Sequence, residues 1–375
     1  MLKNHSENIR FEQFTIEDLN QVDTLIKLTS QAILPFSSLR LASFLNNPRA
    51  LISDVILIVA YHNETLIAYR TLLPDDIQAD LTTIHFAWLS GIWVDNAHRH
   101  LGIGKKLHQM AHEAWEGRLI GTEYTQQNAE VMLSTGFYTQ NVKKSGIIIY
   151  YKSPLEAVLI KRMPNLNRIR SILKLTDKLI DSFGAIKNTI TKPLPFDEQY
   201  QFKLSGGLNA EAINHIQEFG AYSTTNRRSK ELEWIVKYPW IASDAEALMQ
   251  SKKYYFSVFA KSFSTQFLEI FFKGTLQGIV MLTVRDGALR IPYIFVKFKE
   301  LDTTAKYIQQ FAEKEKISKI ISYHSLLNKE LIKWGKRRLF YKNTTRSYMV
   351  SKSLIGLTKL ETLVFTDGDG DCVFV

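Results

Sequence analysis

The chain has 375 residues, of which 45% are hydrophobic, and its formal net charge is +10. This length predicts two or three domains, and the composition supports ordinary apolar cores and excludes a disordered chain. No apolar run approaches the ~20 residues that cross a bilayer, and the first ten residues lack the apolar segment of a secretory signal. We therefore expect a cytoplasmic protein without a membrane span.

Metal and nucleic-acid sites are not favoured by the residue pattern. The only cysteine, Cys372, excludes an intrachain disulfide and a cysteine-based metal site, and the nine histidines lack the spacing of metal ligands. The basic excess lies outside residues 1–150, which hold 12 Lys and Arg against 15 Asp and Glu. It is interleaved with acidic residues, which is more typical of a solvated surface than of a nucleic-acid site.

The first predicted elements are strands. Two apolar runs, residues 55–61 and 65–72, are separated by His62-Asn63 and predict a β-hairpin. The aromatic and aliphatic run 86–94 predicts a further strand. An amphipathic helix follows, because apolar residues recur there at helical spacing on one stripe, namely Leu107, Met110, Ala111, Ala114 and Trp115.

A glycine-containing basic turn joins that strand to that helix. Its landmarks are Arg99, Gly102 and Gly104. Glycines without Cβ atoms allow main-chain N–H groups to close around an anion, and the start of the helix adds the positive end of its dipole. The segment predicts a pyrophosphate site, although a plain tight turn between strand and helix would use the same glycines.

The elements after this helix complete a recognisable order. Residues 119–124 predict a strand, 128–134 a short helix and 145–152 a final strand, with the pair Gly136-Phe137 before it. Together with the strand that ends in Val94 and the turn R-x-x-G-x-G, this arrangement resembles the GCN5-related N-acetyltransferase (GNAT) superfamily over about residues 8–152.

The resemblance implies an activity and a cosubstrate. Members transfer an acyl group from acyl-CoA, with acetyl-CoA the first expectation, by direct attack of an amine on the thioester. The strand edge at Trp93 and Val94 is expected to bind the pantetheine arm. The expected pyrophosphate-binding residues are Arg99, His100, Leu101, Gly102, Ile103, Gly104 and Lys105.

The sequence indicates the general acid and the general base of this reaction less directly. Ser90 stands where many members carry a glutamate, and Met132 stands where a tyrosine commonly protonates the thiolate. We expect Tyr124 as the acid and Glu123 as the base, because the carboxyl ends of strands in open α/β sheets face the ligand crevice. Tyr138, beside the Gly-Phe pair, is a further candidate for the acid.

The second part of the chain predicts a connector and another copy of the fold. Residues 154–195 form an amphipathic helical pattern, which we expect to pack on the protein rather than on a membrane surface. Strands are predicted at 268–272, 277–284 and 288–296, separated by the hairpin turns Lys273-Gly274 and Asp286-Gly287. A helix, strand, helix and strand over residues 304–352 then repeat the order of residues 105–152.

The repeat predicts the domain organisation. The counterpart of the glycine turn, residues 296–302, has no glycine and carries two acidic residues, so one cofactor site per chain is expected. We predict an α/β (α+β) protein with two GNAT-like mixed-sheet domains. Their expected bounds are a catalytic domain at 1–152, a helical linker at 153–199 and a degenerate domain at 200–375.

Two further segments favour structural roles. The aromatic and basic cluster between Arg227 and Trp240 is expected to serve packing rather than acceptor binding. The tail Asp367-Gly368-Asp369-Gly370-Asp371 lacks the remaining ligands of a calcium loop, so it predicts a turn followed by a short terminal strand at 372–375.

The acceptor is expected to be the amine of a small molecule or peptide, which the sequence does not identify. Two alternatives stay open. The absence of the usual glutamate and tyrosine would suit a non-catalytic acyl-CoA sensor or scaffold. An aminoacyl-tRNA-dependent aminoacyl transferase also pairs two copies of this fold, and the basic second half would suit RNA, although such enzymes typically lack the R-x-x-G-x-G turn.

Overall fold

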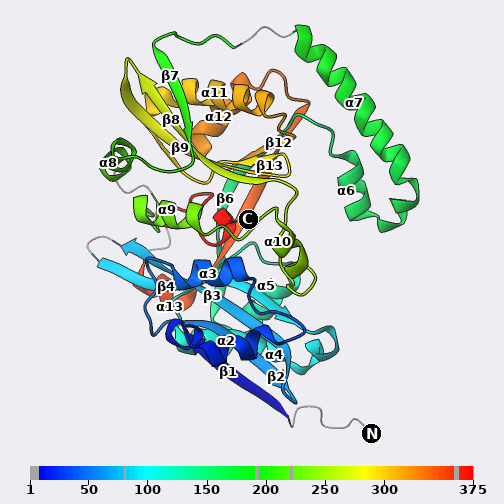
Figure 1. Cartoon of the computed structure of the whole chain (residues 1–375), viewed down its shortest axis with the longest axis vertical. Helices are drawn as coiled ribbons and strands as arrows, with labels where there is room; N and C mark the ends of the chain where they lie inside the picture. Colours follow the sequence, from blue (N-terminus) through cyan, green and yellow to red (C-terminus); the bar gives the residue numbers. More distant parts are fainter. Residues whose placement is uncertain (1–7, 80–81, 191–193, 220–222, 359–362, 375) are drawn as a thin grey trace. The chain divides into compact units, whose positions relative to one another are not determined.

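The computed structural model is a mixed α/β structure that describes residues 8–79, 82–190, 194–219, 223–358 and 363–374 (Figure 1). The chain divides into two compact units. The first comprises Met1–Lys143, Gly220–Lys261 and Arg346–Val375, and the second comprises Lys144–Phe219 and Ser262–Thr345. These bounds differ from those expected from the sequence, because residues 220–261 and 346–375 belong to the first unit.

The closing strands of the two halves explain this difference. In the first unit, β13 (Phe340–Ser351) pairs antiparallel with β5 (Leu119–Thr122) through residues 348–350. In the second unit, β6 (Tyr138–Tyr150) pairs antiparallel with β12 (Lys319–Ser322) through residues 147–150. The last strand of each half therefore completes the sheet of the other unit, which an apolar pattern does not reveal because it predicts a strand and not its partner.

The sheet of the first unit has the order β1-β2-β3-β4-β5-β13. Its remaining strands are β1 (Ile9–Thr15), β2 (Val55–His62), β3 (Thr65–Ala79) and β4 (Thr82–Val94). Only the β4–β5 pairing is parallel. The predicted hairpin of β2 and β3 is confirmed, and its turn residues Asn63 and Glu64 both have positive φ, as a tight hairpin requires.

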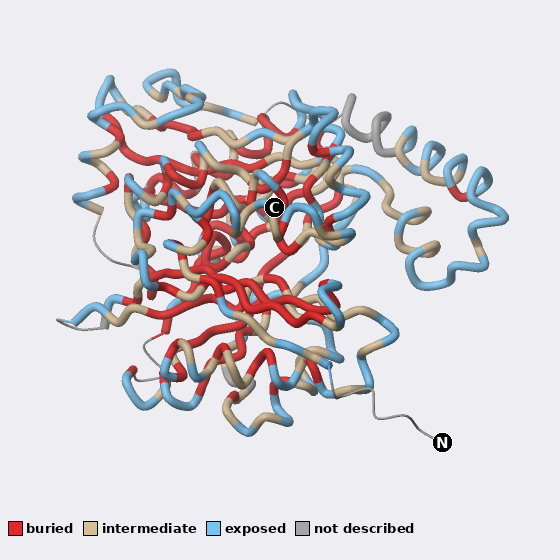
Figure 2. Tube along the Cα trace, turned by 60° about the horizontal axis from the view of Figure 1, so that its bottom comes forward, coloured by how far each residue is buried: buried red, intermediate tan, exposed pale blue. Residues whose placement is uncertain are grey.

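Helices α4 (Ile103–Ala114) and α5 (Gln126–Ser134) cover one face of this sheet. The core beneath them contains Ala68, Leu72, Leu89, Leu107 and Met132. Figure 2 shows that the strands of the first-unit sheet are buried along much of their length. The first unit also contains α1 (Ile16–Leu19), α2 (Val22–Thr29), α3 (Ser38–Leu45), η1 (Asn96–Leu101), α9 (Ser229–Lys237), α10 (Ala245–Gln250), α13 (Lys352–Leu357) and η5 (Cys372–Phe374).

The opposite face is covered by segments distant in sequence. Trp88 of β4 contacts Phe365, and Phe374 stacks on Trp240 with ring centroids 4.5 Å apart. The Nε1 of Trp234 donates to the main-chain oxygen of Ser43 on α3 at 2.8 Å. The aromatic cluster thus serves packing, as expected. The expected terminal strand is wrong within its described part, because residues 372–374 form a 3₁₀ turn, and residue 375 lies outside the described residues.

The sheet of the second unit has the order β6-β12-β10-β9-β8-β7, with β11 paired to β9. Its other elements are β7 (Tyr200–Ser205), α8 (Ala210–Glu218), β8 (Phe263–Phe272), β9 (Thr275–Arg285), β10 (Ala288–Arg290), β11 (Ile294–Val296), η3 (Phe298–Glu300), α11 (Leu301–Lys314) and α12 (Ser325–Trp334). The order of α11, β12, α12 and β13 repeats that of α4, β5, α5 and β6. The expected strand 288–296 is split around Pro292, which has no N–H to donate to a sheet.

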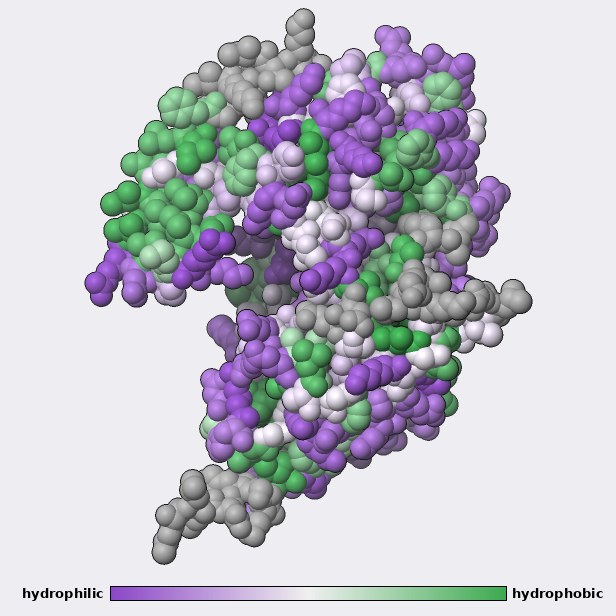
Figure 3. Space-filling view, turned by 180° about the vertical axis from the view of Figure 1, so that it is seen from behind, coloured by the Kyte–Doolittle hydropathy of each residue, from purple (hydrophilic) through white to green (hydrophobic). Residues whose placement is uncertain are grey.

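A helical arm precedes β7 and consists of α6 (Leu155–Arg162), η2 (Pro164–Ile169) and α7 (Arg170–Ile190). Asp177 accepts hydrogen bonds from the main-chain N–H groups of Leu155 and Glu156 at 3.0 and 2.9 Å, so α7 caps the start of α6. Apolar side chains gather on the surface of the arm (Figure 3), among them Ile172, Leu175, Leu179 and Phe183. Among the described residues, no helix combines the length and apolar character needed to cross a bilayer.

A half-buried histidine makes the first unit sensitive to alkali. His85 Nδ1 lies 2.8 Å from Asp76 Oδ1, and its Nε2 lies 3.0 Å from Asp54 Oδ2. Burial alone would lower the pKa of His85, but the hydrogen bonds to the two carboxylates outweigh it and raise the pKa from 6.5 to about 9. A raised folded-state pKa means that this stabilisation is complete below pH 6.5 and is lost as the pH rises through about 9.

We expect His85→Gln to lower the urea midpoint of unfolding more at pH 6 than at pH 9.5. The reason is that the protonated imidazole pairs with both carboxylates only at the lower pH. Urea titrations of both proteins at the two pH values measure this difference. An equal loss of midpoint at both pH values would contradict the assignment.

Candidate active site

A cavity of about 350 Å³ in the first unit brings together most of the predicted site residues. It is bordered by β3, β4, the glycine turn, α4, β5 and α5. The predicted residues that line it are Trp93, Val94, Arg99, Gly102, Gly104, Lys105, Glu123 and Tyr124. The other three are not lining residues: His100 is exposed, Leu101 is half-buried and Ile103 is buried in the core under α4. These three would contribute main-chain groups.

One strand edge opens into this cavity. Within the described residues, β4 pairs with β5 only through residues 87–89, whereas β4 continues to Val94. A β-bulge shifts the β3–β4 register here, and the N–H of Gly91 donates to Thr71 Oγ1 at 2.8 Å. A Cβ at Gly91 would lie 2.7 Å from the ring of Phe256, so this position requires glycine. The main chain of residues 90–94 is thereby presented to a ligand.

The glycine turn has the geometry of an anion site. Asp95 Oδ2 lies 2.7 Å from His98 Nδ1 and accepts from the N–H of Ala97 at 3.2 Å, which fixes the start of η1. Gly102 has φ +71°, and a Cβ added there would meet nothing within 4 Å. The first N–H groups of α4, which begins at Ile103, have no intrahelical acceptor and lie at the positive end of the helix dipole. With Arg99 and Lys105 beside them, they fit a pyrophosphate.

A carboxylate from the C-terminal tail contacts a residue of the cavity wall. Asp371 Oδ2 accepts a hydrogen bond from Ser90 Oγ at 2.8 Å, and Ser90 lines the cavity. The position at which the resemblance implies a glutamate is therefore next to a carboxylate from another part of the chain. Sequence reasoning missed Asp371 because 281 positions separate it from Ser90.

The tail is held by buried hydrogen bonds. Arg227 Nη1 donates to the main-chain oxygens of Gly368 and Gly370 at 3.0 and 3.3 Å. Arg346 Nη2 pairs with Asp367 at 2.8 Å. Gly370 has φ +76°, and a Cβ there would lie 3.0 Å from Thr122 Cγ2, so the tail approaches β5 closely only because this residue is glycine. These contacts fix the main chain immediately before Asp371.

The remaining tail carboxylate is also used in packing. Thr225 Oγ1 donates to Asp369 Oδ1 at 2.5 Å. In the part of the chain that the structure describes, no group of three or more His, Cys, Asp or Glu side chains is arranged to hold a metal ion. The alternating Asp and Gly residues thus serve to seat the tail on the first unit.

The predicted acid and base have different surroundings. Tyr124 is half-buried and lines the cavity. Glu123 also lines it, but its Oε1 lies 3.0 Å from Nε of Arg346, so this carboxylate is engaged in an ion pair. Tyr138 is buried, and burial raises the pKa of its phenol. Met132 is fully buried in the core beneath α4.

The second unit has acidic groups in place of the anion turn. Near the start of α11, Glu300 accepts from the hydroxyl of Tyr200 at 2.6 Å, and Asp302 accepts from Lys333 and from Trp334 Nε1 at 2.7 Å each. These carboxylates occupy the end of the helix that would attract a phosphate. The expectation of a single cofactor site rests on this difference between the two copies.

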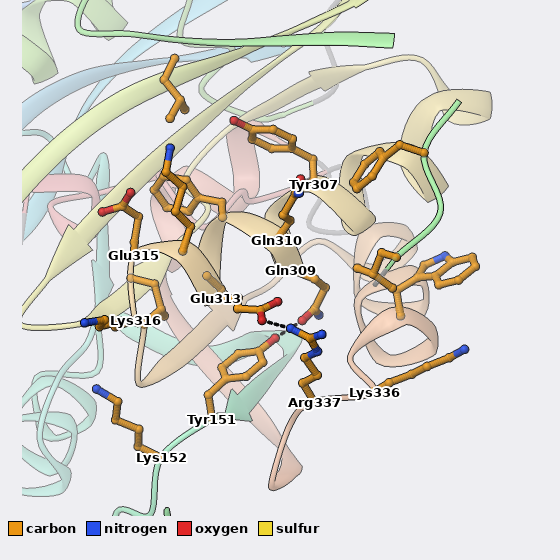
Figure 4. Close-up of a pocket in the computed structure, with 18 of the residues that line it drawn as sticks. Tyr151, Lys152, Tyr307, Gln309, Gln310, Glu313, Glu315, Lys316, Lys336 and Arg337 are labelled. Carbon is orange, nitrogen blue, oxygen red and sulfur yellow. Dashed lines mark hydrogen bonds and ion pairs between the residues drawn. The ribbon is translucent and has the colours of Figure 1, made fainter. Parts of the chain in front are cut away.

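A larger hollow of about 910 Å³ lies in the second unit (Figure 4). Its polar groups engage one another: Arg337 pairs with Glu313, and the hydroxyl of Tyr151 donates to Gln309. Gln309 in turn donates to the main-chain oxygen of Leu331 at 3.0 Å. The hollow lacks a glycine turn, so the smaller cavity is the better candidate for an acyl-CoA site.

Residues 53–141 match the family model described as the acetyltransferase (GNAT) domain. The chain contains a GNAT domain. The match includes β2 to α5 and therefore the turn and most of the cavity lining, whereas Asp371 lies outside it. The second unit repeats the element order of the matched segment, which agrees with the tandem arrangement that the resemblance implied. Comparison with curated protein sequences gives no significant match.

Several solved structures are similar to this chain in fold. A tandem GNAT protein from the clavulanic acid biosynthesis pathway is 10% identical, with a TM-score of 0.46 over 92% of this chain and 98% of that one. A GCN5-related N-acetyltransferase from Anabaena variabilis is 11% identical, with a TM-score of 0.48 over 91% and 72%. Another from Sphaerobacter thermophilus is 9% identical, with a TM-score of 0.43 over 92% and 96%.

Proposed function

We propose that this protein is an acyl-CoA-dependent N-acyltransferase that acts on the amine of a small molecule or peptide. One observation carries the proposal. A single cavity is bordered by an anion turn, an open strand edge and a serine that is hydrogen-bonded to a carboxylate. The GNAT domain match over residues 53–141 supports the same activity.

The residues present fit an acyl-CoA. The turn from Arg99 to Lys105 would hold the pyrophosphate, and the main chain at Trp93 and Val94 would bind the pantetheine arm. Gly102 leaves open space in which main-chain N–H groups approach an anion. The bound acyl-CoA supplies an activated carbonyl carbon, and the protein positions the amine beside it.

Two side chains would transfer the protons of the reaction, one as general base and one as general acid. When the amine nitrogen bonds to the carbonyl carbon, the carbon–sulfur bond breaks and sulfur leaves with the electron pair. We assign Asp371 to accept the proton of the amine, either directly or through the hydroxyl of Ser90, and Tyr124 to donate a proton to the sulfur. Glu123, the base expected from the sequence, is the second choice because its carboxylate pairs with Arg346.

The proposal is tested by replacing the glycine of the turn. We expect Gly102→Leu to weaken CoA binding at least tenfold, since a side chain over the turn obstructs charge-assisted hydrogen bonds worth about 1.5–3 kcal/mol. Gly274→Leu is the matched control: Gly274 has φ +77° and similarly open surroundings, but lies in the hairpin turn between β8 and β9. Titration calorimetry with CoA on both variants measures the effect.

The outcomes separate the alternatives. Both variants should lose similar stability, because each forces a side chain into the left-handed region. Equal CoA affinity in the two variants would contradict the assignment of the turn. Tight CoA binding without thiol release over a panel of amines would favour the sensor or scaffold, and salt-dependent binding of tRNA without CoA binding would favour the aminoacyl transferase.

A further inference from the structure

A buried arginine lies in the wall of the acyl-CoA cavity. Arg70, on β3, is 1% exposed and lines the cavity. Its neighbours on the same face of the strand, Ala68 and Leu72, belong to the apolar core under α4. A cationic side chain therefore lies beside the apolar core of the first unit.

This arginine has no hydrogen-bond partner in the described part of the chain. Its Nε, Nη1 and Nη2 atoms are all buried without a hydrogen-bond acceptor there. Burial lowers the pKa of Arg70 to about 10 and outweighs the opposing effect of the Asp371 carboxylate, so the side chain is still cationic at neutral pH. Two neighbouring polar atoms, the hydroxyl of Tyr138 and Nδ1 of His108, are also buried without a partner among the described residues. Buried polar groups are normally satisfied, so this cluster points to a bound ligand.

The chemistry of the cluster selects an anion. A guanidinium presents five N–H donors in a planar fork that matches a carboxylate. The pyrophosphate has its own site at Arg99 and Lys105, so Arg70 would bind a second negative group. The cavity wall also contains the apolar side chains Leu89, Ile92 and Met132. Such a wall suits a short hydrocarbon segment that ends in a carboxylate.

The positions of Arg70 and Asp371 indicate whether this carboxylate belongs to the acyl group or to the amine acceptor. Arg70 lies between Ala68 and Leu72 in the alternation of β3 and is paired with Ile92, so it lies on the α4 face of the sheet, whereas the bulge at residues 90–91 breaks the alternation of β4. Ser90, by contrast, donates a hydrogen bond to Asp371 of the C-terminal tail. The amine has to approach Asp371, whereas Arg70 lies on the face that carries the pyrophosphate turn. The carboxylate therefore belongs to the acyl group and not to the acceptor.

We propose that Arg70 binds the terminal carboxylate of the acyl group and that the acyl donor is a short dicarboxylic acyl-CoA. Malonyl-CoA and succinyl-CoA represent this class. The proposal rests on the proposed function, because it requires that the cavity binds an acyl-CoA.

Binding measurements on the full chain test the proposed role of Arg70. Dissociation constants are measured by calorimetry for CoA, butyryl-CoA, malonyl-CoA and succinyl-CoA. We expect one of the two dicarboxylic thioesters to bind at least tenfold more tightly than butyryl-CoA, which has an uncharged chain. Arg70→Met should abolish this preference while the dissociation constant for CoA changes by less than twofold.

Two controls distinguish a ligand site from a structural role. Arg99→Met should weaken binding of all four compounds by a similar factor, because it acts on their shared pyrophosphate. Without ligand, Arg70→Met should unfold at the same or a higher temperature than the original chain, since it removes an unpaired buried charge. A lower melting temperature together with an unchanged preference for the dicarboxylic thioester would overturn the proposal.

The failure of this proposal differs from the failure of the proposed function. Equal affinity for butyryl-, malonyl- and succinyl-CoA, with CoA binding still sensitive to Gly102→Leu, overturns only the role of Arg70. Loss of affinity for a carboxylate-bearing acceptor in Arg70→Met, with unchanged acyl-CoA affinities, also overturns it. No binding of CoA by the original chain overturns both.

Discussion

Replacement of Asp371 by asparagine is expected to lower kcat by about 10²- to 10⁴-fold, which is the usual contribution of a positioned general base. Asparagine keeps the size of the side chain and an oxygen that accepts the hydrogen bond from Ser90, but it cannot take the proton of the amine. The tail is seated by Arg227, Arg346 and Thr225, so the variant should keep its fold. The measurement is thiol release with the amine that gives the fastest reaction in a panel.

Glu123→Gln is the matched control for this experiment. Glu123 carries a carboxylate in the cavity wall itself, but it pairs with Arg346. We expect its replacement to change kcat by less than tenfold. The opposite pattern, with full activity in Asp371→Asn and a large loss in Glu123→Gln, would return the role of base to the residue expected from the sequence.

Asp75→Ala should destabilise the first unit by about 3–5 kcal/mol, which is typical when one partner of a buried ion pair is removed. Asp75 is 1% exposed and pairs with Arg227 at 2.8 Å and with Arg49 at 2.7 Å. It also accepts from Trp88 Nε1 at 2.8 Å. Without this carboxylate, the buried guanidinium of Arg227, which holds the tail, loses its ion pair with Asp75, and Arg49 keeps only Glu231 as an ion-pair partner among the described residues.

Urea unfolding followed by tryptophan fluorescence measures this loss, because five of the six tryptophans lie in the first unit. Asp76→Ala is the control: Asp76 pairs with the partly exposed His85, and its replacement should cost less than half as much. A loss below about 1 kcal/mol in Asp75→Ala, the range of an exposed pair, would contradict the buried network.

The same network predicts sensitivity to acid. Burial alone would raise the pKa of Asp75, but the charges of Arg227 and Arg49 outweigh it, so the pKa lies below its usual 3.8. A lowered folded-state pKa contributes stability above the usual value that is lost as the pH falls through the folded value. The difference between Asp75→Ala and the original chain should therefore shrink below pH 3.8.

Local patterns in the sequence predicted local structure well. The turn at Gly102 could be found because its glycines, basic residues and flanking elements are contiguous, and the structure places them on one cavity. Lys273-Gly274 and Asp286-Gly287 both have positive φ, as the predicted hairpins require. The tandem repeat also followed from the order of contiguous elements.

The parts that were missed depend on long-range pairing. No local signal connects Asp371 with Ser90, and the apolar pattern of β13 does not specify β5 as its partner. Arg70 did leave a signal that sequence reasoning did not use, namely a single charge within an otherwise apolar strand from Leu66 to Leu73. Such a charge is either paired across the fold or left for a ligand, and only coordinates distinguish the two.

The exchange of closing strands has a consequence for how the protein is made. During synthesis, the ribosome releases the glycine turn and most of the cavity wall long before it releases residues 346–374. Until then, the β5 edge and one face of the sheet in the nascent first unit stay exposed to solvent. Exposed strand edges and apolar sheet faces are prone to aggregation. The proposed acyl transfer requires Asp371, so a chain that stops before this residue would contain the glycine turn but lack the carboxylate that we assign as the base.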